Sequence, residues 1–173
     1  TYDLPSRMAI MRQDLYKLKH HVLKNPNAKL NNKLTFIKAY LFSKGCYHSS
    51  TWPSLSRRCY TIFNKSIMDS YRELTGEVFC AENKTEPLND QEIIRKFSLI
   101  NPSVLVSMAR LQLFGRIFKK QVSIIMNHIR FHLPKGSSWI AALVQDFKWL
   151  ASSGIYREYY HYTIPQWVGV VKV

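Results

Sequence analysis

The chain has 173 residues, enough for one domain of moderate size or for a compact domain with an appendage. Its apolar stretches all fall short of the roughly 20 residues that a membrane-spanning helix needs, and its three irregularly spaced cysteines exclude a disulfide framework and favour a reducing compartment. The net charge is +14, with 13 Lys and Arg against 3 Asp and Glu in residues 1–72, 1 against 6 in residues 73–92 and 11 against 2 in residues 93–173, so a polyanion is the expected partner, nucleic acid before an anionic membrane.

The first predicted helix starts near Asp3 and Ser6 and runs to a stop at Asn25 and Pro26. Its apolar side chains recur at steps of three and four, at Met8, Met11, Leu15, Leu18 and Val22. The opposite side carries polar and basic residues, namely Gln13, Lys17, His20 and Lys24. This pattern is typical of an amphipathic helix with one face toward a core.

A second helix is predicted from residue 30 to Gly45, where the glycine ends it. One stripe is apolar and consists of Leu30, Leu34, Ile37 and Leu41. The neighbouring stripe mixes ammonium groups with aromatic rings: Lys29, Lys33, Phe36, Tyr40 and Lys44. Ammonium groups neutralise phosphates and rings stack on bases, so this stripe is a candidate for binding nucleic acid, the alternative being an ordinary solvated face.

The third predicted helix opens at Pro53, after the hinge at residues 45–51, and ends at Gly76. Its apolar side is expected to hold Leu55, Cys59, Ile62, Phe63, Ser66, Ile67, Ser70, Tyr71 and Leu74. Its opposite side holds Arg57, Arg58, Thr61, Lys65 and Arg72. Three such helices with short connections are enough to close a bundle over residues 1–76.

Residues 77–88 lose the periodicity and read as an acidic loop, which makes them the expected boundary. Residues 89–154 are predicted as a second helical region. It opens with a capping box from Asn89 to Glu92, continues with a helix starting at Asn101 and Pro102, and includes an apolar segment at residues 122–129. In the helix after Pro102, the side chains expected to face the core are Val104, Leu105, Met108 and Leu111. Its charge comes from Arg110, Arg116, Lys119 and Lys120.

A last helix is predicted from a cap at Ser137 or Ser138 to residues 152–154, with Ile140, Leu143, Phe147 and Leu150 in one stripe. The tail at residues 155–173 is crowded with aromatic residues. An exposed segment of this kind is sticky, so it is expected to pack on this chain or on a neighbouring protein. The prediction for the whole chain is an all-α fold.

Taken together, the basic residues predict contacts to a phosphate backbone, with no pattern that would read base edges. The candidate nucleic-acid-binding residues are Lys17, Lys24, Lys29, Lys33, Phe36, Tyr40, Lys44, Arg57, Arg58, Lys65, Arg72, Arg110, Arg116, Lys119 and Lys120. If the duplex is A-form, its shallow minor groove favours contacts to the 2′-hydroxyl and phosphate groups.

Metal sites and catalytic groups are not expected. Cys46, His48, Cys59 and Cys80 lack CxxC spacing, and His128 and His132 lack the glutamate of a metalloprotease motif. The acidic residues outside the loop are scattered, and there is no Gly-rich phosphate loop. The sequence thus predicts no cofactor, no small-molecule substrate and no enzymatic activity.

Five landmarks follow one another along the chain: Lys33 to Lys38, then Gly45, then Thr51 to Leu55, then Met68 to Leu74, and downstream Arg110 to Arg116. In this order they resemble the thumb of a non-LTR retrotransposon reverse transcriptase, with Arg116 where the family usually has histidine. The likeness covers roughly residues 5–120. It implies a small helical bundle that lies against a template–primer duplex. The fingers, the palm and its metal-binding carboxylates, which polymerisation requires, are absent from the sequence.

A thumb of this kind is expected to serve as a non-catalytic RNA-binding structural protein in a large ribonucleoprotein, such as a mitochondrial ribosome. The first residue, Thr1, fits removal of a targeting peptide, a truncation or an unseen start. The competing expectation is a thumb fragment or subunit of a retroelement polymerase that acts with a separate palm. A third is an accessory subunit of a membrane-bound complex.

Overall fold

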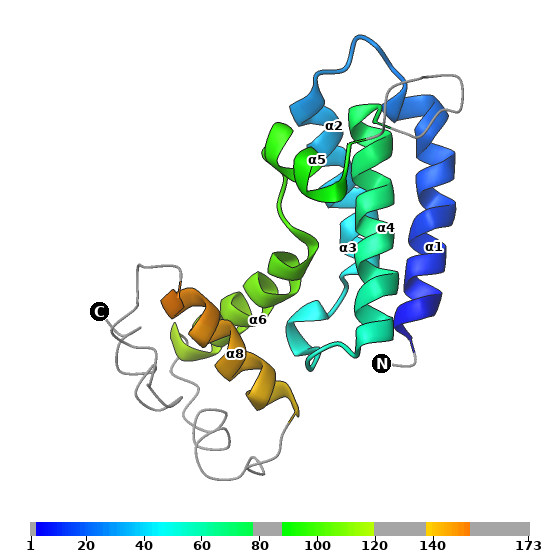
Figure 1. Cartoon of the computed structure of the whole chain (residues 1–173). Helices are drawn as coiled ribbons and strands as arrows, with labels where there is room; N and C mark the ends of the chain where they lie inside the picture. The colour runs from blue at the N-terminus through cyan, green and yellow to red at the C-terminus, as the bar shows by residue number, and fades with distance from the viewer. Residues whose placement is uncertain (1–2, 78–87, 120–137, 153–173) are drawn as a thin grey trace. The chain divides into compact units, whose positions relative to one another are not determined.

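The computed structural model describes residues 3–77, 88–119 and 138–152, and every regular element in these ranges is a helix, which confirms the all-α prediction (Figure 1). The elements, some of them π-helical or 3₁₀ turns, are α1 (Leu4–Leu18), η1 (Lys19–Leu23), α2 (Leu30–Ile37), η2 (Lys38–Phe42), α3 (Ser43–Gly45), η3 (Ser49–Thr51), α4 (Arg57–Thr75), α5 (Asp90–Lys96), α6 (Pro102–Lys119) and α8 (Ser138–Ser152). The chain forms two compact units. The first consists of residues 1–47 and 55–105, and the second of residues 48–54 and 106–173.

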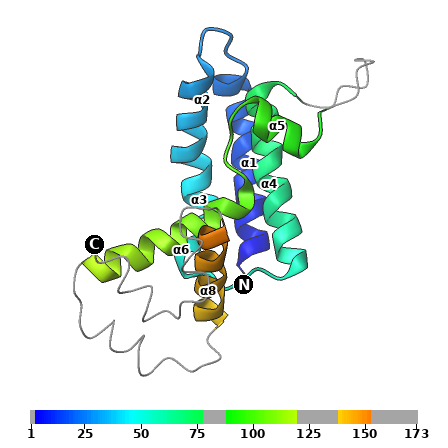
Figure 2. The ribbon, with the colours of Figure 1, turned by 60° about the vertical axis from the view of Figure 1, so that its left-hand side comes forward.

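In the first unit, α1 and α4 pack along each other, and the continuous run α2–η2–α3 lies beside both (Figures 1 and 2). The core side chains that are almost completely buried include Met8, Met11, Ile37, Leu41, Phe63, Ile67 and Tyr71. Tyr71 meets Phe42 edge to face at 5.8 Å between ring centroids, and its hydroxyl donates to the Ile100 carbonyl at 3.0 Å. A single tyrosine therefore ties the bundle to the segment that follows α5.

The close approach of α3 to α1 requires a glycine. A Cβ at Gly45 would lie 2.6 Å from the Met11 sulfur and 3.2 Å from Met8 Cε, and Met8 and Met11 are both fully buried. The predicted helix end at Gly45 is confirmed, because α3 ends there. The apolar stripe of this run is only partly buried: Ile37 and Leu41 are in the core, whereas Leu30 is 37% exposed.

The predicted start of the third helix at Pro53 is wrong. Helix α4 begins at Arg57, where the Ser56 hydroxyl accepts from the Cys59 N–H at 3.3 Å. Its buried face is centred on Phe63, Ser66, Ile67, Met68, Ser70, Tyr71 and Leu74. The helix ends before Gly76, whose φ of +76° is a left-handed conformation that glycine adopts without strain.

The predicted capping box is confirmed. Asn89 Oδ1 accepts from the Glu92 N–H at 2.9 Å, and Glu92 Oε2 accepts from the Asn89 N–H at 2.8 Å. Two of the N–H groups that open the helix are thereby satisfied, so α5 starts where the motif predicts. Helix α5 belongs to the first unit, where Ile93 is its buried anchor.

In the second unit, α6 and α8 contribute Phe114 and Phe147, which pack edge to face at 5.3 Å. The Trp139 indole N–H donates to the Ser50 carbonyl at 2.8 Å, so the short segment 48–54 belongs to this unit. The start of α6 at Pro102 and the end of α8 at Ser152 agree with the sequence prediction.

The predicted inward face of α6 is wrong. Within residues 102–116 of this helix, the buried residues are Pro102, Val106, Arg110 and Phe114, whereas Met108 is 39% exposed and Val104, Leu105 and Leu111 are half-buried. Arg110 lies at the centre of the buried face, although the apolar pattern predicts that this charged side chain faces solvent. The predicted segment at residues 122–129 and the aromatic tail at residues 155–173 lie outside the described residues. Among the described helices, none has the length and apolar character to cross a membrane.

Candidate nucleic-acid interface

The candidate cations divide into those that bind this chain and those left exposed. Within the described residues, several exposed side chains have neither a hydrogen bond nor an ion pair: Lys24, Lys29, Arg57, Arg58, Lys65 and Arg116. Arg57, Arg58 and Lys65 lie on one side of α4, and Lys24 and Lys29 lie in the connection between η1 and α2. These are the groups that a polyanion can reach without breaking an intramolecular bond.

Arg57 and Arg58 stand in an unusual place, because they are the first two residues of α4 and its first turn holds no acidic residue. The helix macrodipole makes a cation unfavourable at this end by roughly 0.3–1 kcal/mol each. The two arginines at the start of α4 therefore do not stabilise this helix through its dipole. An anion bound at this end of α4 would interact favourably with both guanidinium groups and with the dipole.

The mixed stripe from Lys29 to Lys44, which follows α2, η2 and α3, keeps its two rings exposed, but two of its ammonium groups bind acceptors in this chain. Phe36 and Tyr40 stack at 6.0 Å with an interplanar angle of 26°, and they are 41% and 38% exposed. Lys33 Nζ donates to the Leu23 carbonyl at 2.7 Å. Lys44 Nζ lies 4.0 Å from the Tyr40 ring centroid and donates to an Asp14 carboxylate oxygen at 2.6 Å.

These bonds connect Lys33 and Lys44 to other parts of the bundle, so their ammonium groups are not free to bind a phosphate. The hydrogen bond to Asp14 raises the pKa of Lys44, so its ammonium stays charged. Lys17 is also near Asp14, at 3.8 Å, but its side chain is 66% exposed and remains accessible. The exposed ring pair and Lys17 therefore stay in the candidate interface, whereas Lys33 and Lys44 reach a phosphate only in competition with their acceptors in this chain.

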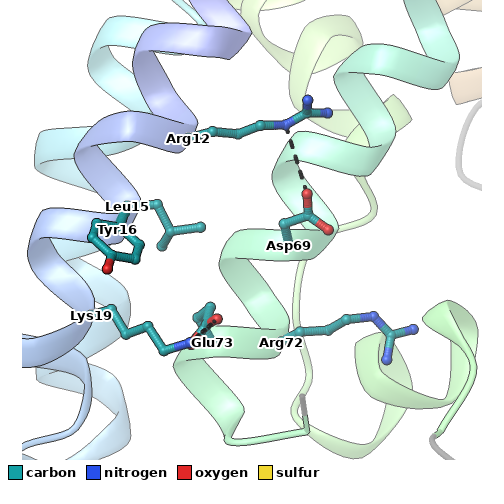
Figure 3. A pocket seen from close by; sticks show the side chains of 7 residues that line it. All are labelled: Arg12, Leu15, Tyr16, Lys19, Asp69, Arg72 and Glu73. Carbon is teal, nitrogen blue, oxygen red and sulfur yellow. Dashed lines mark hydrogen bonds and ion pairs between the residues drawn. The ribbon is translucent and has the colours of Figure 1, made fainter. Parts of the chain in front are cut away.

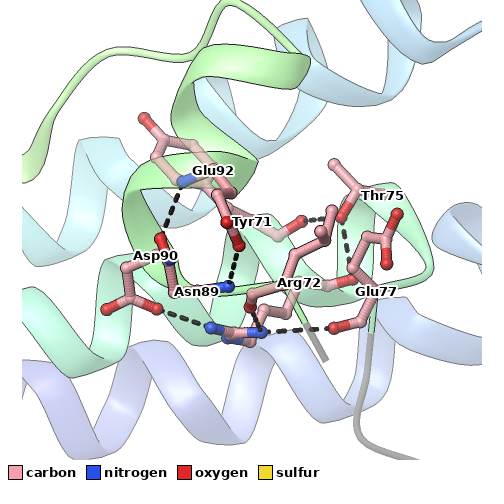
Figure 4. A network of polar contacts seen from close by, with 8 residues as sticks. Tyr71, Arg72, Thr75, Glu77, Asn89, Asp90 and Glu92 are labelled. Carbon is pink, nitrogen blue, oxygen red and sulfur yellow. Dashed lines mark hydrogen bonds and ion pairs between the residues drawn. The ribbon is translucent and has the colours of Figure 1, made fainter. Parts of the chain in front are cut away.

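Arg72 likewise binds acceptors of this chain, and its guanidinium joins α4 to the start of α5 (Figure 4). It donates to Asp90 Oδ1 at 2.7 Å, to the Leu88 carbonyl at 3.0 Å and to the Glu77 carbonyl at 3.4 Å. These acceptors stand on both sides of the acidic loop, so Arg72 fixes the two ends of that loop. Its side chain is 24% exposed.

Arg110 is buried and bound within the chain. Its side chain is 8% exposed and forms a two-point ion pair with the 4% exposed Asp146, at 2.5 and 2.8 Å. Its remaining terminal nitrogen donates to the Trp52 carbonyl at 3.1 Å. Arg110 therefore holds α6, α8 and the segment 48–54 together. Of the other cations predicted for this region, Arg116 is exposed, and the side chains of Lys119 and Lys120 lie outside the described residues.

A hollow of about 300 Å³ between α1 and α4 is a feature that sequence reasoning missed (Figure 3). It is lined by Arg12, Leu15, Tyr16, Lys19, Asp69, Arg72 and Glu73. Lys19 and Glu73 pair across it at 2.8 Å, and Arg12 and Asp69 pair more loosely at 3.7 Å. The signal was present in the sequence, because Arg12, Tyr16 and Lys19 recur at helical spacing opposite Asp69 and Glu73.

The cysteines and acidic residues form no metal centre in the described part of the chain, where no cluster of three potential ligands occurs. Cys46 and Cys59 are free thiols, and burial raises the pKa of Cys46 to about 12. Cys80, His128 and His132 lie outside the described residues. Comparison with family models, with curated proteins and with solved structures gave no match to this chain.

Proposed function

We propose that this chain is a non-catalytic RNA-binding structural protein of a large ribonucleoprotein, with a fold derived from the thumb of a retroelement reverse transcriptase. A mitochondrial ribosome is the first assembly to test. The support is the net charge of +14 together with the group of exposed cations that find no acceptor among the described residues.

The observation that carries the proposal is the side of α4 formed by Arg57, Arg58 and Lys65. The rise from residue 57 to residue 65 is about 12 Å, which matches the distance spanned by roughly three successive phosphates along one strand. The two arginines stand where the helix dipole disfavours them, and none of the three is used for packing. A phosphate backbone along this side would satisfy all three.

The exposed pair Phe36 and Tyr40 supplies a second mode of contact, because aromatic faces stack on bases without regard to sequence. Binding of this kind positions a protein on RNA through backbone and stacking contacts and does not select a sequence. It should weaken steeply with salt, since each neutralised phosphate releases counterions.

The test compares two double variants that remove the same charge. Arg57→Ala with Arg58→Ala removes the two cations at the start of α4, whereas Arg95→Ala with Lys96→Ala removes two consecutive cations from α5, of which Lys96 pairs with Glu77 at 2.7 Å. The measurement is binding of a structured RNA over a salt series, with circular dichroism to confirm folding. We expect the α4 variant to lower the slope of log K against log salt by about 1.4–1.8, the contribution of two phosphates, and the α5 variant to leave it unchanged.

Equal losses in the two variants would show that RNA responds to total charge alone and would refute a binding face on α4. For the assembly, sedimentation of native extract is decisive. A heavy form that RNase disperses supports a ribonucleoprotein, and a free monomer in the extract contradicts it.

The second candidate is the thumb of a polymerase that works with a separately encoded palm. The resemblance supports it, because Gly45 ends a helix, residues 51–55 form the connection and Met68 to Leu74 lie on the helix that follows. Co-purification with a palm-bearing subunit, or primer extension by the reconstituted pair, would favour this candidate over a structural role.

A further inference from the structure

The hollow between α1 and α4 has a distinct arrangement (Figure 3). The Arg12–Asp69 pair bounds one end and the Lys19–Glu73 pair bounds the other. Leu15 reaches toward α4 between them and gives the hollow an apolar floor. Tyr16 stands beside Leu15 on α1, with 71% of its surface exposed.

The two ion pairs differ in how far they satisfy their members. Lys19 and Glu73 are in hydrogen-bond contact at 2.8 Å, and their side chains are 27% and 19% exposed. Arg12 and Asp69 are 3.7 Å apart, too far for a hydrogen bond, and their side chains are 42% and 39% exposed. Among the described residues, no hydrogen bond reaches the carboxylate of Asp69 or the guanidinium of Arg12.

Asp69 is thus an acceptor that is short of donors. Its burial raises its pKa, although the cations Arg12, Lys65 and Arg72 act in the opposite direction. A ligand that brings N–H donors into the hollow would offset the cost of holding this carboxylate partly out of water. The guanidinium of Arg12, which makes no hydrogen bond among the described residues, can at the same time donate to an acceptor of the same ligand.

On the premise of the proposed function, we infer that the hollow receives an unpaired RNA base, with a preference for guanine. Guanine presents two adjacent N–H donors, N1–H and N2–H, on its Watson–Crick edge, and a carboxylate accepts both. Adenine offers one donor position beside one acceptor on that edge, cytosine offers one donor position beside two acceptors, and uracil offers a single N–H between two acceptors. Only an unpaired base can expose this edge, so the site reads single-stranded loops or ends.

Size and surroundings agree with this ligand. About 300 Å³ is of the order of a nucleobase with part of its sugar, at the small end of ligand pockets. The Tyr16 ring at the rim offers a face on which the base can stack. Lys65 is exposed and lies one turn before Asp69 on α4. It can therefore bind the backbone phosphate of the same nucleotide, on the side of α4 that also carries Arg57 and Arg58.

The experiment measures binding of three short oligouridylates to the full chain: one with a central guanine, one with a central adenine and one with a central inosine, which lacks the N2 donor. We expect guanine to bind roughly 10-fold to 100-fold more tightly than adenine, with inosine in between. Asp69→Asn should remove most of this preference, because the amide cannot accept both N–H groups of guanine.

The control is Asp3→Asn, which makes the same chemical change on an exposed carboxylate outside the hollow and should retain the preference. Tyr16→Ala should lower the affinity for all three oligonucleotides by the same factor, because stacking on the ring does not depend on which base is present. Oligouridylate binding without a guanine preference, or a preference that survives Asp69→Asn, overturns this inference and leaves the RNA-binding proposal standing. A chain that binds neither structured RNA nor any oligonucleotide overturns both.

Discussion

Replacing Asp146 with alanine should strongly destabilise the second unit. The Arg110 guanidinium is almost fully buried and directs two nitrogens at Asp146, at 2.5 and 2.8 Å, and a third at the Trp52 carbonyl, at 3.1 Å. Alanine at position 146 removes the counter-charge and two of these three hydrogen bonds. It leaves the cation buried with a single carbonyl partner.

Breaking a buried pair from one side costs about 3–5 kcal/mol, because the remaining charge is uncompensated. Domains of this size are stable by only about 5–15 kcal/mol, so the variant loses a large share of its stability. The double variant Arg110→Met with Asp146→Leu removes both charges and should recover most of the loss. It should remain about 1–3 kcal/mol below the wild type, because the Trp52 carbonyl loses its donor.

Urea unfolding followed by tryptophan fluorescence measures this effect selectively. All four tryptophans, at positions 52, 139, 149 and 167, belong to the second unit, whereas circular dichroism reports the helices of both units. We expect the fluorescence midpoint of the single variant to fall well below that of the wild type. A single variant within about 1 kcal/mol of the wild type, or a double variant as unstable as the single one, would refute the assignment of a buried compensated pair.

Two glycine substitutions should change stability in opposite directions in chemical denaturation. Gly45→Ala should destabilise the first unit by about 1 kcal/mol, because crowding of the new Cβ against Met11 costs roughly 1–3 kcal/mol and exceeds the gain in helix propensity. Gly115→Ala should stabilise α6 by up to about 1 kcal/mol, because a Cβ at this position meets nothing within 4 Å. Cys46 should resist alkylation at pH 8 in the native chain, because a pKa of about 12 lowers its thiolate fraction about a thousandfold from that of a free thiol, and mass spectrometry before and after unfolding checks this.

Local signals in the sequence predicted the helices well. The capping box at Asn89 and the start of α6 at Pro102 depend on neighbours within three or four residues, and both appear where the motifs place them. The start of α4 shows the limit of such signals. Pro53 is a favourable first residue for a helix, but α4 begins only after the cap at Ser56. In the segment before it, the carbonyls of Ser50 and Trp52 accept from Trp139 and Arg110 rather than from a helical turn.

The inward face of α6 was mispredicted for a related reason. Hydrophobic periodicity counts an arginine as exposed, yet Arg110 is buried because Asp146, 36 residues away, compensates it. Lys44 repeats the pattern, since its acceptor Asp14 is 30 residues distant. A cation's role depends on whether an acceptor comes within reach in the folded chain, and sequence spacing does not report that distance.

The surplus of cations, by contrast, holds for any fold of this sequence. With 25 Lys and Arg against 11 Asp and Glu, one-to-one pairing leaves 14 cations without an acid. Their mutual repulsion disfavours the compact state, and a polyanion that binds the folded chain relieves it by mass action. Folding decides which cations form the surplus: Arg72 and Arg110 find acceptors, whereas Arg57, Arg58 and Lys65 do not. Because these three cations share one side of α4, a phosphate backbone along that side can neutralise several charges at once.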